Sequence, residues 1–270
     1  MLSKLLSLTD VAVIAHRGGA KLLPENTIAS FDHAASLGVD AVECDVHLSR
    51  DGEVVVIHDS TLDRTTDARG PVASLSAAEL ARVDAGYHFG SREGHPFRGR
   101  GFGVPRLADL LDRYRDLPLI VEIKGQRPEM ADTVLGVIAE ATAIDRVIIG
   151  GFSDAVLARV RRLASDVITS ASKDEVRSAL RRAYFRLPPR SPRFQVFQVP
   201  YRFHGRRRFG RAFTQAARRA ALPVQAWIVD DPDDMRRLLG WGVTGIISDR
   251  PDIALAIVRA KGKGQRAEER

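Results

Sequence analysis

The sequence has a single cysteine, Cys44, among 270 residues. One thiol excludes an intramolecular disulfide and is compatible with a reducing compartment. No apolar stretch approaches the roughly 18 residues that a membrane-spanning helix needs. The apolar N-terminus is interrupted by Asp10 and followed by Arg17, where a signal peptide would have a small-residue cleavage site. The sequence therefore predicts a cytoplasmic protein without a secretory signal.

Several common functional signatures are also missing. There is no P-loop, no GxSxG nucleophile elbow, no Rossmann fingerprint and no repeat of solenoid period. Hydrophobic residues make up 44% of the chain, which is ordinary for a globular protein with a full core. The chemistry must therefore come from side chains that other motifs bring together.

The positive charge is unevenly distributed. The net charge is +7, yet residues 146–220 hold 18 Lys and Arg against 4 Asp and Glu, which leaves the rest of the chain negative. The densest part, residues 201–213, interleaves aromatic residues with arginines. Either these arginines cover solvated helix faces, or they form a patch that contacts an anionic membrane. No nucleic-acid-binding signature accompanies the charge, so nucleic acid is not an expected partner.

Short β-branched segments alternate with longer helical patterns along the chain. Near-continuous apolar runs are typical of parallel strands that are covered on both faces. Strict alternation at this count favours a (β/α)8 TIM barrel, as a single domain over residues 1–262, rather than an open doubly wound sheet. The eight expected strands are 11–15, 39–48, 117–124, 146–152, 165–170, 193–199, 222–229 and 243–248.

Two segments depart from this alternation. The Asp51-Gly52 turn predicts that the segment 53–59 returns as an extra hairpin strand. Residues 60–104 are rich in glycine and polar residues, which indicates an insertion. At the other end of the chain, residues 263–270 are expected to be a frayed basic tail.

A barrel places catalytic residues at the C-terminal ends of its strands. Charged residues stand there in this sequence, although parallel core strands should be apolar. Partners two residues apart on a strand point to the same face. The charged residues in question are His16 and Arg17, Glu43 and Asp45, Glu122 and Lys124, and, on the hairpin strand, His58 and Asp59.

These residue types together indicate phosphoryl chemistry. Glu43, Asp45 and Glu122 would be costly to bury together without a cation, and all-oxygen ligands favour Mg²⁺ or Ca²⁺. Salt bridges from Arg17 or Lys124 are the competing explanation. Two histidines beside carboxylates favour an acid–base pair, and fixed cations suit a phosphate.

The sequence also resembles a known family. The segment "AHRGGAKLLPENTIASFDHAASLGVDAVECDVHLSRDGEVVVIHDSTLDRTT" is similar to the opening of the glycerophosphodiester phosphodiesterases, whose pattern is HRG, PENT, E-x-D, a DG turn and HD. The segments "VPRLADLLD", "VEIK" and "WIVDDPDDMRRLLGWGVTGIISDRP" extend the resemblance to residue 251. The family fold is a TIM barrel with a small insertion after the HD, as expected for residues 60–104.

The resemblance implies metal-dependent hydrolysis of a glycerophosphodiester, such as glycerophosphocholine or glycerophosphoethanolamine, to sn-glycerol 3-phosphate and an alcohol. The attacking oxygen is either water or a neighbouring glycerol hydroxyl. The roles it implies are metal ligands (Glu43, Asp45, Glu122), catalytic histidines (His16, His58), phosphate-binding cations (Arg17, Lys124), a site-ordering glutamate (Glu25) and an aromatic near the substrate (Trp227). As a mechanistic hypothesis, we assign His16 as the base and His58 as the acid.

The chain departs from the family pattern at Ile228, Asp230 and Thr244. These positions lie on the seventh and eighth expected strands, where they could change substrate contacts. One alternative is a lysophospholipase D that acts on lysophospholipids at a membrane surface through the same core residues, with the basic, aromatic segment 201–213 docked on the membrane. A non-enzymatic binding protein on a decayed barrel is a further alternative, which the intact histidines and carboxylates disfavour.

Overall fold

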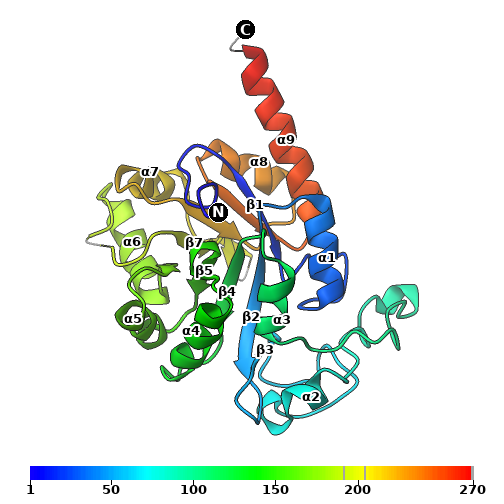
Figure 1. Ribbon diagram of the computed structural model, residues 1–270. Helices are drawn as coiled ribbons and strands as arrows, with labels where there is room; N and C mark the ends of the chain where they lie inside the picture. Colours follow the sequence, from blue (N-terminus) through cyan, green and yellow to red (C-terminus); the bar gives the residue numbers. More distant parts are fainter. Residues whose placement is uncertain (191, 204, 269–270) are drawn as a thin grey trace.

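The computed structural model describes residues 1–190, 192–203 and 205–268, and its centre is a barrel of parallel strands (Figure 1). The strand order is β6-β5-β4-β2-β1-β11-β10-β7, and a parallel bridge between Ser170 and Val196 joins the two ends. This confirms the predicted (β/α)8 fold. The barrel strands are β1 (Ala12–His16), β2 (Ala41–Leu48), β4 (Leu119–Ile123), β5 (Val147–Gly150), β6 (Ile168–Thr169), β7 (Phe197–Pro200), β10 (Val224–Trp227) and β11 (Gly245–Ser248).

Helices surround the barrel, and local sequence signals set their ends. The Thr27 side chain accepts a hydrogen bond from the Ser30 backbone at the start of α1, and Gly38 ends that helix in the left-handed region. Asp231 caps α8, with Pro232 in its first turn. The helices are α1 (Ile28–Leu37), α2 (Ala77–Leu80), α3 (Leu107–Arg113), α4 (Met130–Glu140), α5 (Asp154–Leu163), α6 (Lys173–Tyr184), α7 (Arg211–Arg219), α8 (Pro232–Gly240) and α9 (Pro251–Glu268).

Side chains on the barrel strands change character along each strand. Outward-facing residues such as Val42 and Cys44 are apolar and belong to the main core with the helices. Inward-facing residues near the strand starts, such as Ile14 and Ile120, fill the barrel interior. Towards the strand ends the inward positions become charged, which brings these groups together at one end of the barrel.

The N-terminal segment closes the other end of the barrel. Leu2 and Leu5 are buried against the interior residues, and Gln225 donates a hydrogen bond to the Leu5 carbonyl at 3.0 Å. The apolar N-terminus, which the sequence does not support as a secretory signal, therefore has a packing role. No helix in the described part of the chain is long and apolar enough to cross a bilayer.

The predicted hairpin and insertion are both present. β3 (Val54–Val56) pairs antiparallel with β2, and residues 60–104 carry α2 and short 3₁₀ turns beside it (Figure 1). The insertion has a small hydrophobic cluster of its own, which includes Leu62 and Leu80 and packs on β3 through Val55. It is an ordered extension of the hairpin edge.

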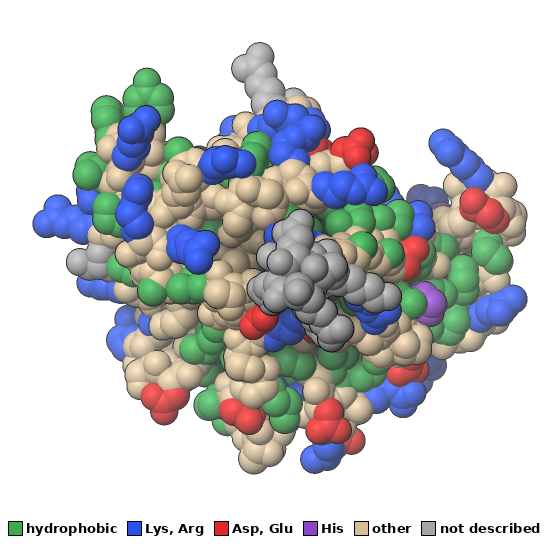
Figure 2. Space-filling view, turned by 90° about the horizontal axis from the view of Figure 1, so that it is seen from above, with side chains coloured by type: hydrophobic (Ala, Val, Ile, Leu, Met, Phe, Trp, Pro, Cys, Tyr) green, Lys and Arg blue, Asp and Glu red, His purple; other side chains and the backbone are tan. Residues whose placement is uncertain are grey.

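The basic tail, residues 263–270, and the basic segment 201–213 both differ from what the sequence predicts. The helix α9 continues to Glu268, through most of the predicted tail, while residues 269–270 lie outside the described residues. In the segment 201–213, the aromatic residues Tyr201, Phe209 and Phe213 are buried in the core, so they are unavailable to a membrane. Their spacing reflects packing around the small hairpin of β8 (Arg202–Phe203) and β9 (Arg206–Arg207). On the face seen in Figure 2, Lys and Arg side chains are spread out rather than gathered in one patch.

Candidate active site

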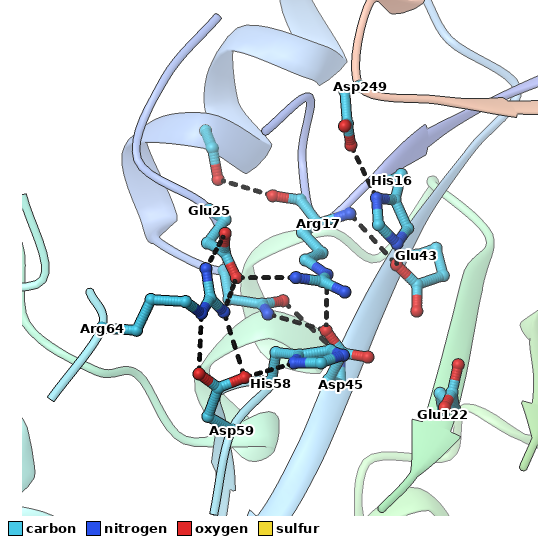
Figure 3. A network of polar contacts seen from close by, with 12 residues as sticks. His16, Arg17, Glu25, Glu43, Asp45, His58, Asp59, Arg64, Glu122 and Asp249 are labelled. Atoms are coloured by element: carbon cyan, nitrogen blue, oxygen red, sulfur yellow. Dashed lines mark hydrogen bonds and ion pairs between the residues drawn. The ribbon is translucent and has the colours of Figure 1, made fainter. Parts of the chain in front are cut away.

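His16 ends β1 and is held by a carboxylate from the neighbouring strand. β1 pairs with β11, and the residue after β11 is Asp249, whose Oδ1 lies 2.6 Å from His16 Nδ1 (Figure 3). Asp230 accepts a hydrogen bond from the Asp249 backbone at 2.9 Å, which fixes that turn. Burial lowers the pKa of His16, but Glu43 and Asp249 outweigh it, so the pKa lies above its ordinary value. With Nδ1 bonded to Asp249, Nε2 remains to exchange a proton.

His58, at the end of the hairpin strand, has the same arrangement. Its Nδ1 lies 2.5 Å from Asp59 Oδ1, and Arg64 Nε donates to Asp59 Oδ2 at 2.7 Å. Burial would raise the pKa of Asp59, but Arg64 and His58 lower it to about 2, so the carboxylate stays ionised. Nδ1 is bonded to Asp59, which again leaves Nε2 of the ring for chemistry.

Three carboxylates lie between the histidines because the strand register aligns them. Asp45 pairs with Glu122 across β2 and β4, and His16 pairs with Glu43 across β1 and β2. One oxygen from each of Glu43, Asp45 and Glu122 lies within 4.8 Å of the others. The predicted carboxylate cluster is therefore present.

The competing salt bridges are present as well. Arg17 Nε lies 3.0 Å from Asp45 Oδ2, and Lys124 Nζ lies 2.9 Å from Asp45 Oδ1 and 2.5 Å from Glu122 Oε1. Burial raises the pKa of Asp45, but Lys124 and Arg17 outweigh it and hold that pKa below its usual range.

The two cations do not neutralise three carboxylates. Burial, followed by the charges of Asp45 and Glu122, raises the pKa of Glu43 to about 8. Asp45 Oδ1 is buried, and Lys124 is its ion-pair partner at 2.9 Å. Three carboxylate oxygens lie close together, and the anionic form of Glu43 is disfavoured without a further cation. This arrangement fits a hard divalent cation, with Glu43, Asp45 and Glu122 as its ligands.

The loop after β1 braces the site. Glu25 accepts hydrogen bonds at 2.8 Å from Arg17 and from Arg64, so it links the two histidine ends of the site. Asn26 Nδ2 donates to Asp45 Oδ2 at 2.9 Å. Gly18 has a φ of 82°, and a Cβ there would lie 2.4 Å from Ser30 Oγ, so only glycine fits against α1. The loop therefore places Arg17 and Glu25 as one unit.

The charged groups surround a cavity of about 170 Å³. Trp227 lines it, as expected from the resemblance, and its ring makes an edge contact with Phe152 at a centroid distance of 5.8 Å. The lining residues are His16, Arg17, Glu43, His58, Ile120, Glu122, Lys124, Phe152, Gln198, Trp227, Ile228 and Ile247.

Of the three departures from the family pattern, only Ile228 lines this cavity. Asp230 does not line the cavity, but it accepts a hydrogen bond from the backbone of Asp249, which contacts His16. Thr244 precedes β11 at the opposite end of the barrel, where its hydroxyl accepts a hydrogen bond from the Val224 backbone at 3.2 Å. The expectation that Thr244 affects substrate contacts is therefore wrong, because the residue lies at the start of the strand and not at its end.

Sequence reasoning missed several supporting residues. Asp249 and Arg64 orient the histidines, and Phe152 lines the cavity. The sequence identifies Asp59 as a member of the HD pair but does not indicate its contact with His58. Asp249 stands directly after an apolar strand, which is the signal that exposed the other site residues. Arg64 has no such signal, because the insertion brings it to the site.

Comparison with known proteins decides the family. The family model described as the glycerophosphoryl diester phosphodiesterase family matches residues 16–253. The chain belongs to this family. Among its relatives, the glycerophosphodiester phosphodiesterase of Caldanaerobacter subterraneus is 33% identical over 93% of this chain and 98% of its own length.

Solved structures agree with the family's fold. A glycerophosphoryl diester phosphodiesterase from Silicibacter pomeroyi has a TM-score of 0.79 and 27% identity, covering 96% of this chain and 98% of its own. An Oleispira antarctica phosphodiesterase, solved with sn-glycerol 3-phosphate, has a TM-score of 0.75 and 24% identity, covering 92% of this chain and 96% of its own. The predicted phosphodiesterase family and barrel are thus confirmed.

Proposed function

We propose that the protein hydrolyses glycerophosphodiesters, such as glycerophosphocholine or glycerophosphoethanolamine, to sn-glycerol 3-phosphate and an alcohol in a metal-dependent reaction. The observation that carries the proposal is the arrangement around one cavity. Two histidines, each bonded through Nδ1 to a carboxylate, line the same cavity as Glu43, Glu122 and Lys124. The name of the Caldanaerobacter relative supports the same substrate class.

The carboxylates and the cations of the site bind different groups. Glu43, Asp45 and Glu122 would hold Mg²⁺ or Ca²⁺, which would offset the negative charge of the phosphodiester and of its transition state. Arg17 and Lys124 supply fixed positive charge for the phosphate oxygens. Glu25 keeps Arg17 in place through its 2.8 Å hydrogen bond. Trp227 and Phe152 form the wall against which the substrate lies.

The histidines move the protons. His16 Nε2 takes a proton from the attacking oxygen, which is water or a neighbouring substrate hydroxyl. His58 Nε2 gives a proton to the leaving alkoxide. Asp249 and Asp59 each hold one ring through Nδ1, which leaves Nε2 of both rings free for proton transfer without rearrangement.

The alternative function is a lysophospholipase D reaction with the same catalytic groups. Phe152 and Ile228, which line the cavity, are 50% and 37% exposed, so an apolar chain could contact them. Contact of residues 201–213 with an anionic membrane remains a prediction. Tyr201, Phe209 and Phe213 are buried, so these three rings would not take part in that contact.

The test is turnover of purified protein on glycerophosphocholine and on lysophosphatidylcholine, after chelation and after Mg²⁺ or Ca²⁺ is restored. We expect release of glycerol 3-phosphate from the first substrate only with metal. His58→Ala should lower kcat by at least about 100-fold, as for loss of an acid–base group. His33→Ala, on α1, is the matched control and should be unaffected. Metal-independent turnover, or full activity of His58→Ala, would refute the mechanism, and preference for the lysolipid would favour the alternative.

A further inference from the structure

A second cavity continues outward from the catalytic one. It has a volume of about 310 Å³ and shares Glu122, Phe152, Gln198 and Trp227 with the cavity that holds the histidines. We call it the α6 groove, because Lys173, Val176, Arg177 and Leu180 of α6 line one side of it. A group attached to a phosphate at the carboxylate cluster could therefore extend past the Phe152 and Trp227 rings into this groove.

Apolar side chains line much of the α6 groove. Phe152 and Trp227 meet edge to face at 5.8 Å, and Val176, Leu180 and Pro200 line it as well. Such surfaces suit the carbon skeleton of a polyol or a similar ring-sized group, whose CH faces pack against aromatic rings. The volume accommodates an alcohol of this size.

The outer part of the α6 groove is basic. Lys173 and Arg177 stand four residues apart on the exposed face of α6, and Arg208 approaches from the chain after β9. Beyond them the surface continues past Arg181 and Arg207. No ion pair involving Lys173 occurs within the described chain. Arg177 pairs with Asp174 at 3.0 Å, but both side chains are more than half exposed, so a ligand anion can compete.

Acidic groups are scarce along the α6 groove. Among the described residues that line it, Glu122 at the inner end is acidic, and it belongs to the carboxylate cluster. Asp174 lies on the outer rim, paired with Arg177. A quaternary ammonium group placed there would meet Lys173 and Arg177, with Asp174 already paired to Arg177, whereas a phosphate or carboxylate would meet cations.

We infer that the α6 groove holds the leaving alcohol, and that Lys173 and Arg177 select alcohols that carry an anionic group over alcohols that carry a quaternary ammonium. The inference rests on the proposed phosphodiesterase activity and specifies its substrate class. Lys173 and Arg177 act on specificity and take no part in the chemical step, since they contact the part of the substrate that does not react.

The experiment measures kcat/KM on diesters that differ only in the alcohol. Glycerophosphoglycerol is the neutral reference, and glycerophosphocholine carries the quaternary ammonium. Glycerophosphoserine carries a carboxylate beside an ammonium, and glycerophosphoinositol 4-phosphate carries a phosphate. We expect the native enzyme to prefer at least one anionic diester over glycerophosphocholine by about tenfold or more. The two anionic substrates distinguish a phosphate from a carboxylate site.

The variant Lys173→Gln/Arg177→Gln should bring this preference close to one, mainly through a higher KM for the anionic diester. Activity on glycerophosphoglycerol should stay within about twofold, because no catalytic group is touched. The matched control is Arg162→Gln/Arg218→Gln, which removes the same charge from exposed positions on α5 and α7 outside the groove. It should keep the preference.

The other outcomes separate the two proposals. Turnover of all four diesters without a charge preference, or an unchanged preference in Lys173→Gln/Arg177→Gln, overturns this inference and leaves the proposed function standing. A preference for lysophosphatidylcholine over every diester overturns it by assigning the α6 groove to an acyl chain. No turnover of any diester with metal supplied overturns both.

Discussion

Single carboxyl groups in this site have opposite tasks that depend on their neighbours. Asp59 and Asp249 each touch a histidine ring and hold it in one orientation. Glu43, from the same end of the barrel, is buried beside Asp45 and Glu122, and its pKa rises to about 8. Identical chemistry at the residue level therefore gives an orienting group in one place and a potential metal ligand in another.

The raised pKa of Glu43 predicts how stability varies with pH. Its pKa moves from 4.5 in the unfolded chain to about 8 in the folded one, so the folded state binds more protons between these values. In chelator-treated protein, the free energy of unfolding should therefore decrease as pH rises from ~5 to ~8, by up to about 1.4 kcal/mol per pH unit. Urea denaturation at several pH values measures this slope.

The variant Glu43→Gln should flatten most of that slope. The pKa of His16 is also raised, so the free energy of unfolding decreases further as pH rises above 6.5, the pKa of this histidine in the unfolded chain. The variant should therefore keep a smaller slope, which comes from His16. Adding Mg²⁺ or Ca²⁺ should stabilise the native protein more at pH 8 than at pH 5, since metal binding requires the ionised carboxylate. Equal slopes for the native protein and Glu43→Gln would contradict this assignment.

Among the elements, the loop from Arg17 to Asn26 does most to build the site. It carries Arg17 and Glu25, and it turns against α1 at a point where Gly18 leaves no space for a side chain. Backbone conformation and close packing coincide at this glycine. The loop geometry, and with it the position of Arg17, therefore depends on the missing side chain.

Gly18→Ala tests this dependence. The new methyl would clash with Ser30, and the alanine backbone would have to adopt a left-handed φ of 82°. The loop must therefore shift. We expect the free energy of unfolding to decrease by about 2–4 kcal/mol, and KM to rise as Arg17 moves. Denaturation and steady-state kinetics measure the two effects.

Gly52→Ala is the matched control. Gly52 has a φ of 84° in the hairpin turn, but a Cβ there would meet nothing within 4 Å. Its loss of stability should be limited to backbone strain, about 1 kcal/mol, with unchanged KM. Equal effects of the two substitutions would show that crowding against α1 is unimportant.

At the scale of the whole molecule, the two ends of the barrel have separate roles. The C-terminal ends of the strands carry the charged site, and the N-terminal segment closes the other end with Leu2 and Leu5. The barrel interior between them is a packed apolar cluster that includes Ile14 and Ile120. This separation allows stability and activity to be altered independently.

Leu5→Ala should show that independence. Leu5 is 1% exposed, so truncation removes buried apolar surface and leaves a cavity. The free energy of unfolding should decrease by about 2–4 kcal/mol, while kcat/KM at a temperature well below the transition stays within about twofold. Thermal denaturation and kinetics on the same preparation measure both quantities.

Lys4→Ala, which removes a partly exposed ion pair with Asp40 from the same segment, should cost less than about 1 kcal/mol. A comparable loss in Lys4→Ala and Leu5→Ala would mean that the segment contributes through its charge. A large loss of kcat in Leu5→Ala would mean that the two ends of the barrel are coupled.

The sequence by itself determined the barrel and the charged cluster at its strand ends. Eight apolar runs that alternate with helical patterns predict the strands, and charged pairs two residues apart, such as Glu43 with Asp45, predict an inward-facing site at the strand ends. These features are local or periodic, so they can be found without knowing which strands are neighbours.

Only the tertiary structure decided what supports and surrounds that site. Asp249 meets His16 because β11 closes against β1, and Arg64 reaches Asp59 and Glu25 from an insertion without a periodic pattern. The buried aromatics of 201–213 and the distant place of Thr244 likewise follow from packing. Contacts between residues far apart in the chain depend on barrel closure and burial, and no local spacing encodes them.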